Sequence, residues 1–280
     1  MDPAASTDRP LDRQDALRRL MARDGRAVLL VLLLTVAAEL GVYFSVRPAT
    51  GEMLALLAAL AATAVWIAIV SPAMAASAGS GLSALLRGGI VADASAVALL
   101  VLWAVCPFLS FVAAVKIYCI HAAMALFAVG AVRSARKPAG RHAAAAVTAA
   151  ALMLALATPF WAGGAVHAAG QSTRRVLVSA AVYVNPFYAT TDALFAETGF
   201  VWDEASFLYE HVQQLVDYAP PSPRWYAPIL LLGGLAVVFS AVVLLRKRGP
   251  GDSHRVQHDA HTTAIDAASR RAPGRPPRGD

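Results

Sequence analysis

The chain reads Leu54-Ala-Leu-Leu-Ala-Ala-Leu-Ala-Ala-Thr-Ala-Val-Trp-Ile-Ala-Ile-Val70 without one charged side chain, and this stretch lies in one of six long apolar runs. A helix rises about 1.5 Å per residue, so roughly 20 apolar residues cross the ~30 Å hydrocarbon core of a bilayer. Inside lipid the backbone must satisfy its own hydrogen bonds, and one helix per run does so. We therefore predict an all-α polytopic membrane protein. Its six transmembrane helices are expected at residues 27–46, 53–77, 90–115, 117–132, 143–166 and 226–245.

Composition agrees with a chain that lies largely within a bilayer. Hydrophobic residues make up 58% and charged residues 15%, whereas a soluble domain carries about a quarter charged residues. The net charge of +6 does not indicate a nucleic-acid partner, because most basic residues cluster beside the apolar runs. Cys106 and Cys119 lie inside such runs, so we expect small packing residues rather than a disulfide or zinc site. The first run is longer than the apolar part of a secretory signal and is expected to be retained.

The basic residues predict the orientation of the six helices. Nineteen of the 24 Lys and Arg fall in the N-terminal segment, near residues 78–89, in the loop 133–142 and in the C-terminal tail. Basic residues concentrate on the cytoplasmic side of membrane proteins, so both termini are expected in the cytoplasm and the protein in the cytoplasmic (inner) membrane. The third and fourth helices are separated by Lys116 alone. Without a turn there, the number of helices would fall to five.

The two ends of the chain are expected to lie outside the bilayer. Residues 1–26 mix leucines with charges, as in an amphipathic helix on the inner leaflet or in a solvated lead-in. Residues 247–280 are rich in Gly, Pro, Arg, His and Asp and too polar to bury a core, so we predict a disordered basic tail. His254, His258 and His261 lie in this tail without a cysteine or an ordered surrounding, and we predict no metal site there.

Residues 167–225 form a sizeable segment that is expected outside the membrane. It connects the first five transmembrane helices, expected within 27–166, to the sixth, expected at 226–246. The apolar stretch 176–184 is too short to span, so it either extends the fifth helix or dips into the outer leaflet. Pro186 restricts Asn185 and blocks continuation of a helix, which predicts a break. Thr191 or Asp192 is a good N-cap for a short helix that would end at Gly199.

A second amphipathic helix is expected further along the same external segment. Apolar residues recur every three or four positions, which places them on one face of a helix. The stripe comprises Val201, Ala205, Leu208, Val212 and Leu215. The segment 186–218 is therefore expected to form two helices that pack against the outer ends of the transmembrane bundle.

Ionisable residues inside or beside the apolar runs are few, and each is a candidate functional residue. We expect Asp93, Lys116 and His167 near the membrane interfaces and Glu39 about two turns from the outer end of its helix. His121, one turn into the fourth run, is expected to hydrogen-bond a neighbouring helix, with a proton relay or ligand binding as the alternative. The sequence contains no metal-binding motif, nucleophilic triad or phosphate-binding loop. We accordingly predict no enzymatic activity, no cofactor and no ATP hydrolysis by this chain itself.

Three motifs give the chain a resemblance to a known family. Ala128-Val-Gly-Ala-Val-Arg-Ser134 is followed by a basic loop and then an alanine-rich run. Asn185-Pro-Phe-Tyr188 follows the fifth run, and the last run ends in Leu244-Leu-Arg-Lys-Arg248. In this order the motifs resemble the permease subunit of type-2 ABC transporters over residues 10–248.

The resemblance implies a six-helix export subunit that pairs as a homo- or heterodimer and draws energy from a separate ATPase subunit. It implies an ATPase-coupling element between the second and third helices, expected as a short cytoplasmic helix or turn at residues 78–90. The element maps onto Ser83, Leu85, Leu86 and Arg87. It also implies an external gate, which maps onto Asn185, Pro186, Phe187 and Leu208.

The coupling element departs from the family pattern. The family places charged residues around Gly-Thr-Leu-Glu-Leu-Leu, whereas this chain has Gly81-Leu-Ser-Ala-Leu-Leu86 without flanking acids. This difference favours a second interpretation, in which the protein is a membrane scaffold or assembly protein derived from such a permease. A third interpretation, an intramembrane enzyme, lacks a recognisable active site.

Overall fold

A computed structural model describes residues 11–135, 137–158, 166, 168–195 and 221–247. Within these residues the fold is entirely helical, which confirms the predicted class. The long helices are α1 (Leu11–Thr50), α2 (Glu52–Ala76), α3 (Gly81–Val105), α4 (Phe111–Ser134), α5 (Pro138–Leu156) and α10 (Ala227–Lys247), and the shorter ones are α7 (Gln171–Val184) and α8 (Pro186–Phe195). Six segments are long and apolar enough to cross a membrane, namely Val28–Thr50, Glu52–Ala76, Gly81–Val105, Phe111–Ser134, Pro138–Leu156 and Ala227–Leu245.

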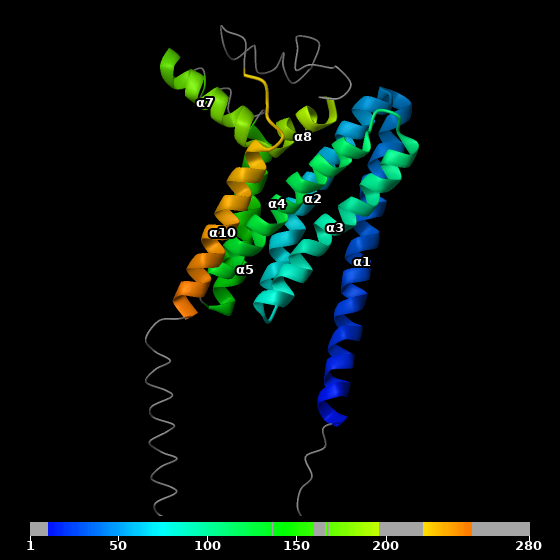
Figure 1. The fold of residues 1–280 in the computed structure, drawn as a ribbon, viewed down its shortest axis with the longest axis vertical. Coiled ribbons are helices and arrows are strands. Elements are labelled where there is room, and N and C mark those ends of the chain that lie inside the picture. Colours follow the sequence, from blue (N-terminus) through cyan, green and yellow to red (C-terminus); the bar gives the residue numbers. More distant parts are fainter. Residues whose placement is uncertain (1–10, 136, 159–165, 167, 196–220, 248–280) are drawn as a thin grey trace, which may run out of the picture.

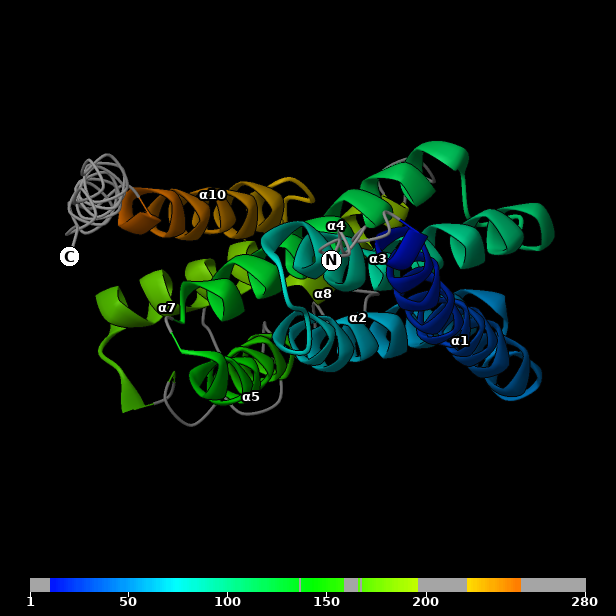
Figure 2. The ribbon, with the colours of Figure 1, turned by 90° about the horizontal axis from the view of Figure 1, so that it is seen from below.

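The bundle has two distinct ends. The start of α1 and the end of α10 lie at the lower end in Figure 1, together with the turn between α2 and α3, and we call this the terminal end. Helices α7 and α8 lie at the opposite end, which we call the elbow end. Helix α2 packs against α1, α3, α4 and α5, and α4 also packs against α10 and α8. Figure 2 shows α1 and α10 at opposite sides of this arrangement.

The third and fourth helices meet at a different place from the predicted one. Helix α3 ends at Val105, and residues 106–110, which include Pro107, connect it to α4. Ser110 caps α4 because its hydroxyl accepts a hydrogen bond from the Ala113 amide at 3.0 Å. The expected turn at Lys116 is therefore wrong, and Lys116 lies inside α4, yet six helices remain.

The observed helix ends place the ionisable residues deeper than predicted. Asp93 is twelve residues into α3, so it lies about 18 Å along the helix rather than near an interface. Glu39 is eleven residues from the end of α1 and His121 ten residues from the start of α4, about three turns in each case. His167 lies outside the described residues.

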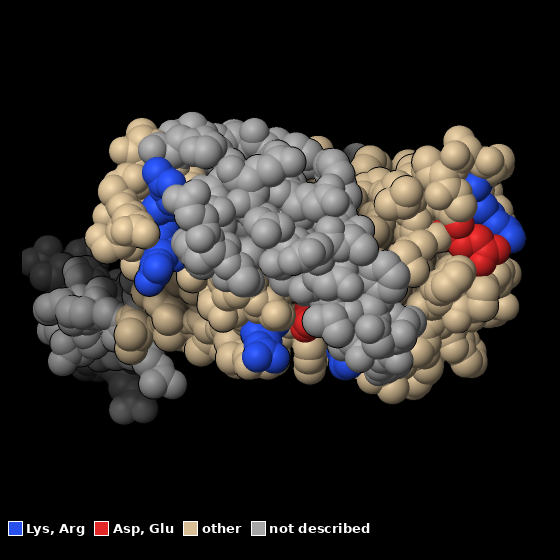
Figure 3. Space-filling model, turned by 90° about the horizontal axis from the view of Figure 1, so that it is seen from above, with Lys and Arg blue, Asp and Glu red and all other residues tan. Residues whose placement is uncertain are grey.

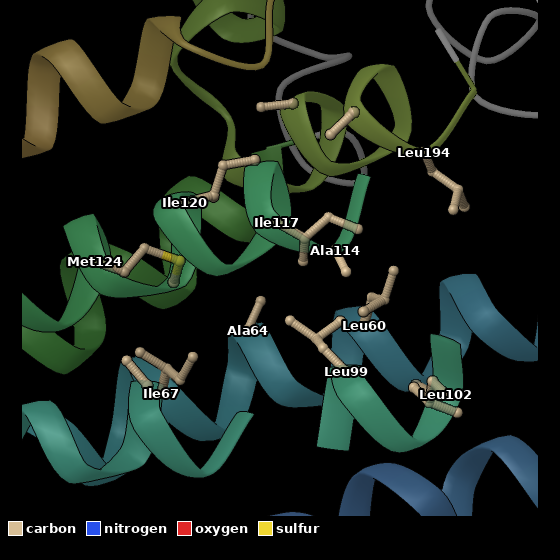
Figure 4. Packing of buried hydrophobic residues seen from close by; sticks show 14 of the residues in the cluster. Leu60, Ala64, Ile67, Leu99, Leu102, Ala114, Ile117, Ile120, Met124 and Leu194 are labelled. Atoms are coloured by element: carbon tan, nitrogen blue, oxygen red, sulfur yellow. The ribbon is translucent and has the colours of Figure 1, made fainter. Parts of the chain in front are cut away.

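The core consists mainly of aliphatic and small side chains from α2, α3 and α4, and α1, α5, α8 and α10 add a few more. Figure 4 shows Leu60, Ala64 and Ile67 of α2 facing residues of α3 and α4, among them Leu99, Leu102, Ile117 and Met124. Lipid tails are as apolar as these side chains, so association in a bilayer depends on close van der Waals packing rather than on release of water. Ala55, Ala59 and Thr63, spaced by four, are all buried and form such a close-packing face.

Two glycines allow the closest approaches between helices. A Cβ atom at Gly88 of α3 would lie 2.2 Å from Val129 Cγ2 of α4. The Gly88 carbonyl also accepts a 3.0 Å hydrogen bond from the Ser71 hydroxyl of α2. At Gly130 of α4, a Cβ would lie 3.3 Å from the Ala236 carbonyl oxygen of α10. Glycine at these positions therefore sets how closely α4 packs against α3 and α10.

Replacement of Gly88 by leucine is expected to destabilise the bundle, because the buried, β-branched Val129 cannot move aside freely. Overpacking of this kind costs about 1–3 kcal/mol. Thermal unfolding of the purified protein in detergent measures the effect. The matched control is Gly89→Leu, since a Cβ at Gly89 would meet nothing within 4 Å. Equal stability of the two variants would contradict the predicted contact.

Candidate functional site

Asn185 forms an elbow between α7 and α8 and connects both to the end of α5. Its side-chain amide donates to the carbonyl of Ala155 at 2.9 Å and approaches that of Leu156 at 3.4 Å. Its side-chain oxygen accepts from the Phe187 amide at 2.8 Å, which caps α8. The predicted break is present. Helix α8, however, begins at Pro186 instead of at Thr191, because proline is well suited to the first position of a helix.

Asp192 holds the start of the last transmembrane helix against α8. Its carboxylate accepts a 2.9 Å hydrogen bond from the Trp225 amide, two residues before α10. Thr191 donates to the Tyr188 carbonyl inside the helix, so neither residue is the N-cap that the sequence predicted. Lys116 of α4 lies over the Trp225 ring, 5.8 Å from its centroid. Burial raises the pKa of Tyr188, so its phenol stays neutral.

An apolar cavity of about 190 Å³ lies below the elbow. This volume is smaller than the several hundred Å³ of a typical ligand pocket, so it suits a short apolar group. The wall is formed by α2, α5 and Phe187 of α8. The lining residues are Ala61, Val65, Met153, Leu156, Ala157 and Phe187. Sequence analysis identified Phe187 and missed the others, because they are ordinary apolar residues brought together from distant helices.

The structure brings three of the four expected gate residues together. Asn185, Pro186 and Phe187 are consecutive at the elbow, and Asn185 and Pro186 are buried. Leu208 lies outside the described residues, as do Gly199 and the predicted amphipathic stripe 201–215. Figure 3 views the elbow end and shows small, separated groups of charge in its described part. The ion pair between Arg47 at the end of α1 and Glu52 at the start of α2 also lies at the elbow end.

The expected coupling residues lie on the first two turns of α3, at the terminal end. The connection from α2 is only residues 77–80, and the Ser80 hydroxyl caps α3 by accepting from the Ser83 amide at 3.1 Å. Residues 81–90, which are most of the short cytoplasmic helix or turn expected at 78–90, thus belong to the long helix α3. Arg87 donates to the Ser77 carbonyl at 3.3 Å, across this turn.

Three leucines at the start of α3 expose apolar surface at the terminal end. Leu82, Leu85 and Leu86 are 69%, 47% and 66% exposed, and we call them the leucine patch. Leu82 was missed by the motif comparison, although its spacing of three and four from the other two places it on the same face. The Nη1 atoms of Arg133 and Arg141 both reach the Ala78 carbonyl, at 3.4 and 3.5 Å. Basic side chains from the end of α4 and the start of α5 therefore border the α2–α3 turn.

These features define a polytopic α-helical membrane protein with an apolar patch at one end and a hydrogen-bonded elbow at the other. Within its described part, no group of three or more His, Cys, Asp or Glu is placed to hold a metal ion. Comparison with protein-family models, with curated proteins and with solved structures finds no match.

Replacement of Asn185 by aspartate is expected to destabilise the elbow although it keeps the α8 cap. The carboxylate can still accept from the Phe187 amide, but its second oxygen would face the carbonyls of Ala155 and Leu156, with which Asn185 now bonds. Loss of such buried hydrogen bonds costs about 1–3 kcal/mol. Thermal unfolding in detergent measures this loss. As a control, Ser240→Ala removes only a bond to a carbonyl of its own helix. An Asn185→Asp protein as stable as the wild type would show that the elbow does not depend on these bonds.

Proposed function

We propose that this protein is the membrane-spanning permease subunit of an ABC-type exporter, which moves its substrate across the cytoplasmic membrane with energy from a separate ATPase. In this proposal the terminal end faces the cytoplasm and the elbow end faces outward. The observation that carries it is the leucine patch, an exposed apolar surface at the turn between the second and third transmembrane helices. A partner protein that binds there would be in a position to move α3.

The order of the elements supports the same proposal. The patch and the basic side chains of Arg133 and Arg141 lie at one end, while the elbow and the apolar cavity lie at the other. An energy-supplying subunit and an exit gate must occupy opposite faces of an exporter. The chain itself carries no phosphate-binding loop, so the proposal assigns ATP hydrolysis to the partner.

A dimer of permease subunits is supported by the position of Asp93. Its side chain faces out of the bundle near mid-membrane, where it accepts a 3.1 Å hydrogen bond from the Tyr118 hydroxyl of α4. Ionisable side chains within the hydrocarbon region almost always face a protein interior or a water-filled cavity. A second copy or a related subunit packed against this face of α3 and α4 would shield Asp93 from lipid.

The alternative function is a membrane scaffold that no longer couples to an ATPase. The absence of acidic residues around the α2–α3 turn favours it, because the related family has charges there. A scaffold would use the same apolar surfaces to hold partners, but its action would not depend on ATP.

Crosslinking tests the coupling role of the leucine patch. We expect Ser83→Cys, in a background without Cys106 and Cys119, to crosslink to a P-loop ATPase that co-purifies with the chain. Glu52→Cys at the elbow end is the control and should give no such product. If an ATPase co-purifies and neither position crosslinks, the patch is not its binding site. If no ATPase co-purifies and the chain works without ATP, the scaffold function is favoured.

A second crosslink tests the dimer. Val97 is one turn from Asp93 on the same outward face of α3 and is 42% exposed. We expect Val97→Cys to form a disulfide-linked dimer in native membranes. Val147→Cys on α5, which is 70% exposed, is the matched control and should remain monomeric. Equal crosslinking at both positions would indicate random collisions and contradict the assigned interface.

A further inference from the structure

Four transmembrane helices each contribute one polar side chain to a buried cluster. Glu39 of α1 is 1% exposed, and its carboxyl lies beside the hydroxyls of Thr63 of α2 and Ser95 of α3. Ser95 Oγ lies 2.8 Å from Nδ1 of His121 on α4, and His121 is fully buried. We call these residues the Glu39 cluster. The expected hydrogen bond from His121 to a neighbouring helix is thereby confirmed.

The cluster lies at one depth in the bundle. Glu39 and Thr63 are eleven residues from the elbow ends of their helices, and Ser95 and His121 are ten. At about 1.5 Å per residue, all four lie about 15–16 Å from that end, near the middle of a ~30 Å hydrocarbon core. A polar group at this depth is costly unless it has partners or a function.

Hydrogen-bonding capacity inside the cluster is incompletely used. Neither carboxyl oxygen of Glu39 has a partner at hydrogen-bond geometry. The same is true of Nε2 of His121. The Thr63 hydroxyl already donates its one proton to the Ala59 carbonyl at 3.0 Å, so toward Glu39 it can only accept. A carboxylate offers acceptors alone, whereas a protonated carboxyl can donate to Thr63 or to Ser95. When the Ser95 hydroxyl donates its proton to Nδ1 of His121, the surroundings of Glu39 therefore match the protonated acid.

Charged groups around the cluster do not compensate an ionised Glu39. On α1 the next titratable groups toward the elbow end are Tyr43, one turn away, and then Arg47, which pairs with Glu52 at the start of α2. On α3 the nearest is Asp93, which faces outward with Tyr118 of α4. Lys116 of α4 lies near the elbow end, over Trp225. Among the described residues, then, His121 is the base best placed to exchange a proton with Glu39.

We propose that Glu39, Ser95 and His121 form an intramembrane proton-binding site, in which a proton held by Glu39 is exchanged with His121 through the Ser95 hydroxyl. In the resting state of this proposal the Glu39 side chain turns so that its acid donates to Ser95, while Ser95 donates to the unprotonated Nδ1 of His121. In the transfer, the Glu39 O–H bond breaks as its proton bonds to Ser95 Oγ. The original Ser95 proton leaves for His121 Nδ1. The products are a Glu39 carboxylate and a His121 imidazolium.

Infrared difference spectroscopy of the full chain, reconstituted in lipid, tests the proton on Glu39. We expect the carbonyl stretching band of a protonated carboxylic acid at neutral pH, lost reversibly at alkaline pH. The nearly isosteric Glu39→Gln variant should lose this band. The control Asp93→Asn removes another mid-membrane carboxyl and should retain it. Absence of the band from the wild type, or its persistence in Glu39→Gln, would overturn the proposal.

Two further measurements test the path through Ser95. Ser95→Ala should shift the acid band to higher wavenumber, because the acid loses the hydroxyl to which it donates. Thr148→Ala removes a helix-internal hydroxyl bond on α5 and should leave the band in place. Nitrogen-15 spectra of the wild-type protein, assigned with His121→Gln, should show His121 protonated on Nε2 at neutral pH. An unshifted band in a folded Ser95→Ala protein, or the opposite tautomer, would refute the exchange path.

Discussion

The bilayer supplies no hydrogen-bond partners, and most features of this structure follow from that constraint. Serine and threonine within the helices donate to carbonyls of their own preceding turn, as Thr35, Thr63, Thr148 and Ser240 do. At the start of three helices a side chain accepts from a free amide, namely Ser80 for α3, Ser110 for α4 and Asn185 for α8. Against this background of local satisfaction, a buried carboxyl without a hydrogen-bond partner is an exception. That contrast is the reason to assign a function to the Glu39 cluster, although it contains only four residues.

Close packing is the second consequence, because lipid removes the hydrophobic drive that holds soluble bundles together. Helix α4 occupies a central position and meets α3 at Gly88 and α10 near its own Gly130. The buried face of α2 includes Ala55, Ala59 and Thr63 at intervals of four, and these small residues let neighbouring backbones come near enough for polar side chains on different helices to touch. The Ser95–His121 hydrogen bond depends on this proximity of α3 and α4. Small residues thus determine the spacing, and the spacing permits the polar contacts.

Hydropathy predicted the number and class of the helices but not their ends or their contacts. The third helix begins nine residues earlier than expected, because glycines and Arg87 made residues 81–89 resemble a loop. The break at 106–110 escaped notice, since Pro107 lies inside a continuous apolar run. Asn185 was identified as a break, but its bonds to Ala155 and Leu156 join positions about thirty residues apart and leave no local signal. Glu39 and His121 were recognisable in the sequence as ionisable residues within apolar runs. Thr63 and Ser95 were not, because only their contacts with residues of other helices make them part of the cluster.

Helix α3 connects the two features for which a function is proposed. It is continuous from Gly81 to Val105, so the leucine patch at its start and Ser95 belong to one rigid element. Ser95 is nine residues beyond Leu86, about 14 Å along the helix. Proton exchange between Glu39 and His121 requires the Ser95 hydroxyl to lie within hydrogen-bond distance of both. A shift of α3 by even an ångström, driven by a partner at the patch, would break one of these contacts and stop the exchange. Conversely, ionisation of Glu39 and His121 would draw three helices together through Ser95 and so act back on the patch. Reciprocity of this kind is a requirement of any coupling between two sites.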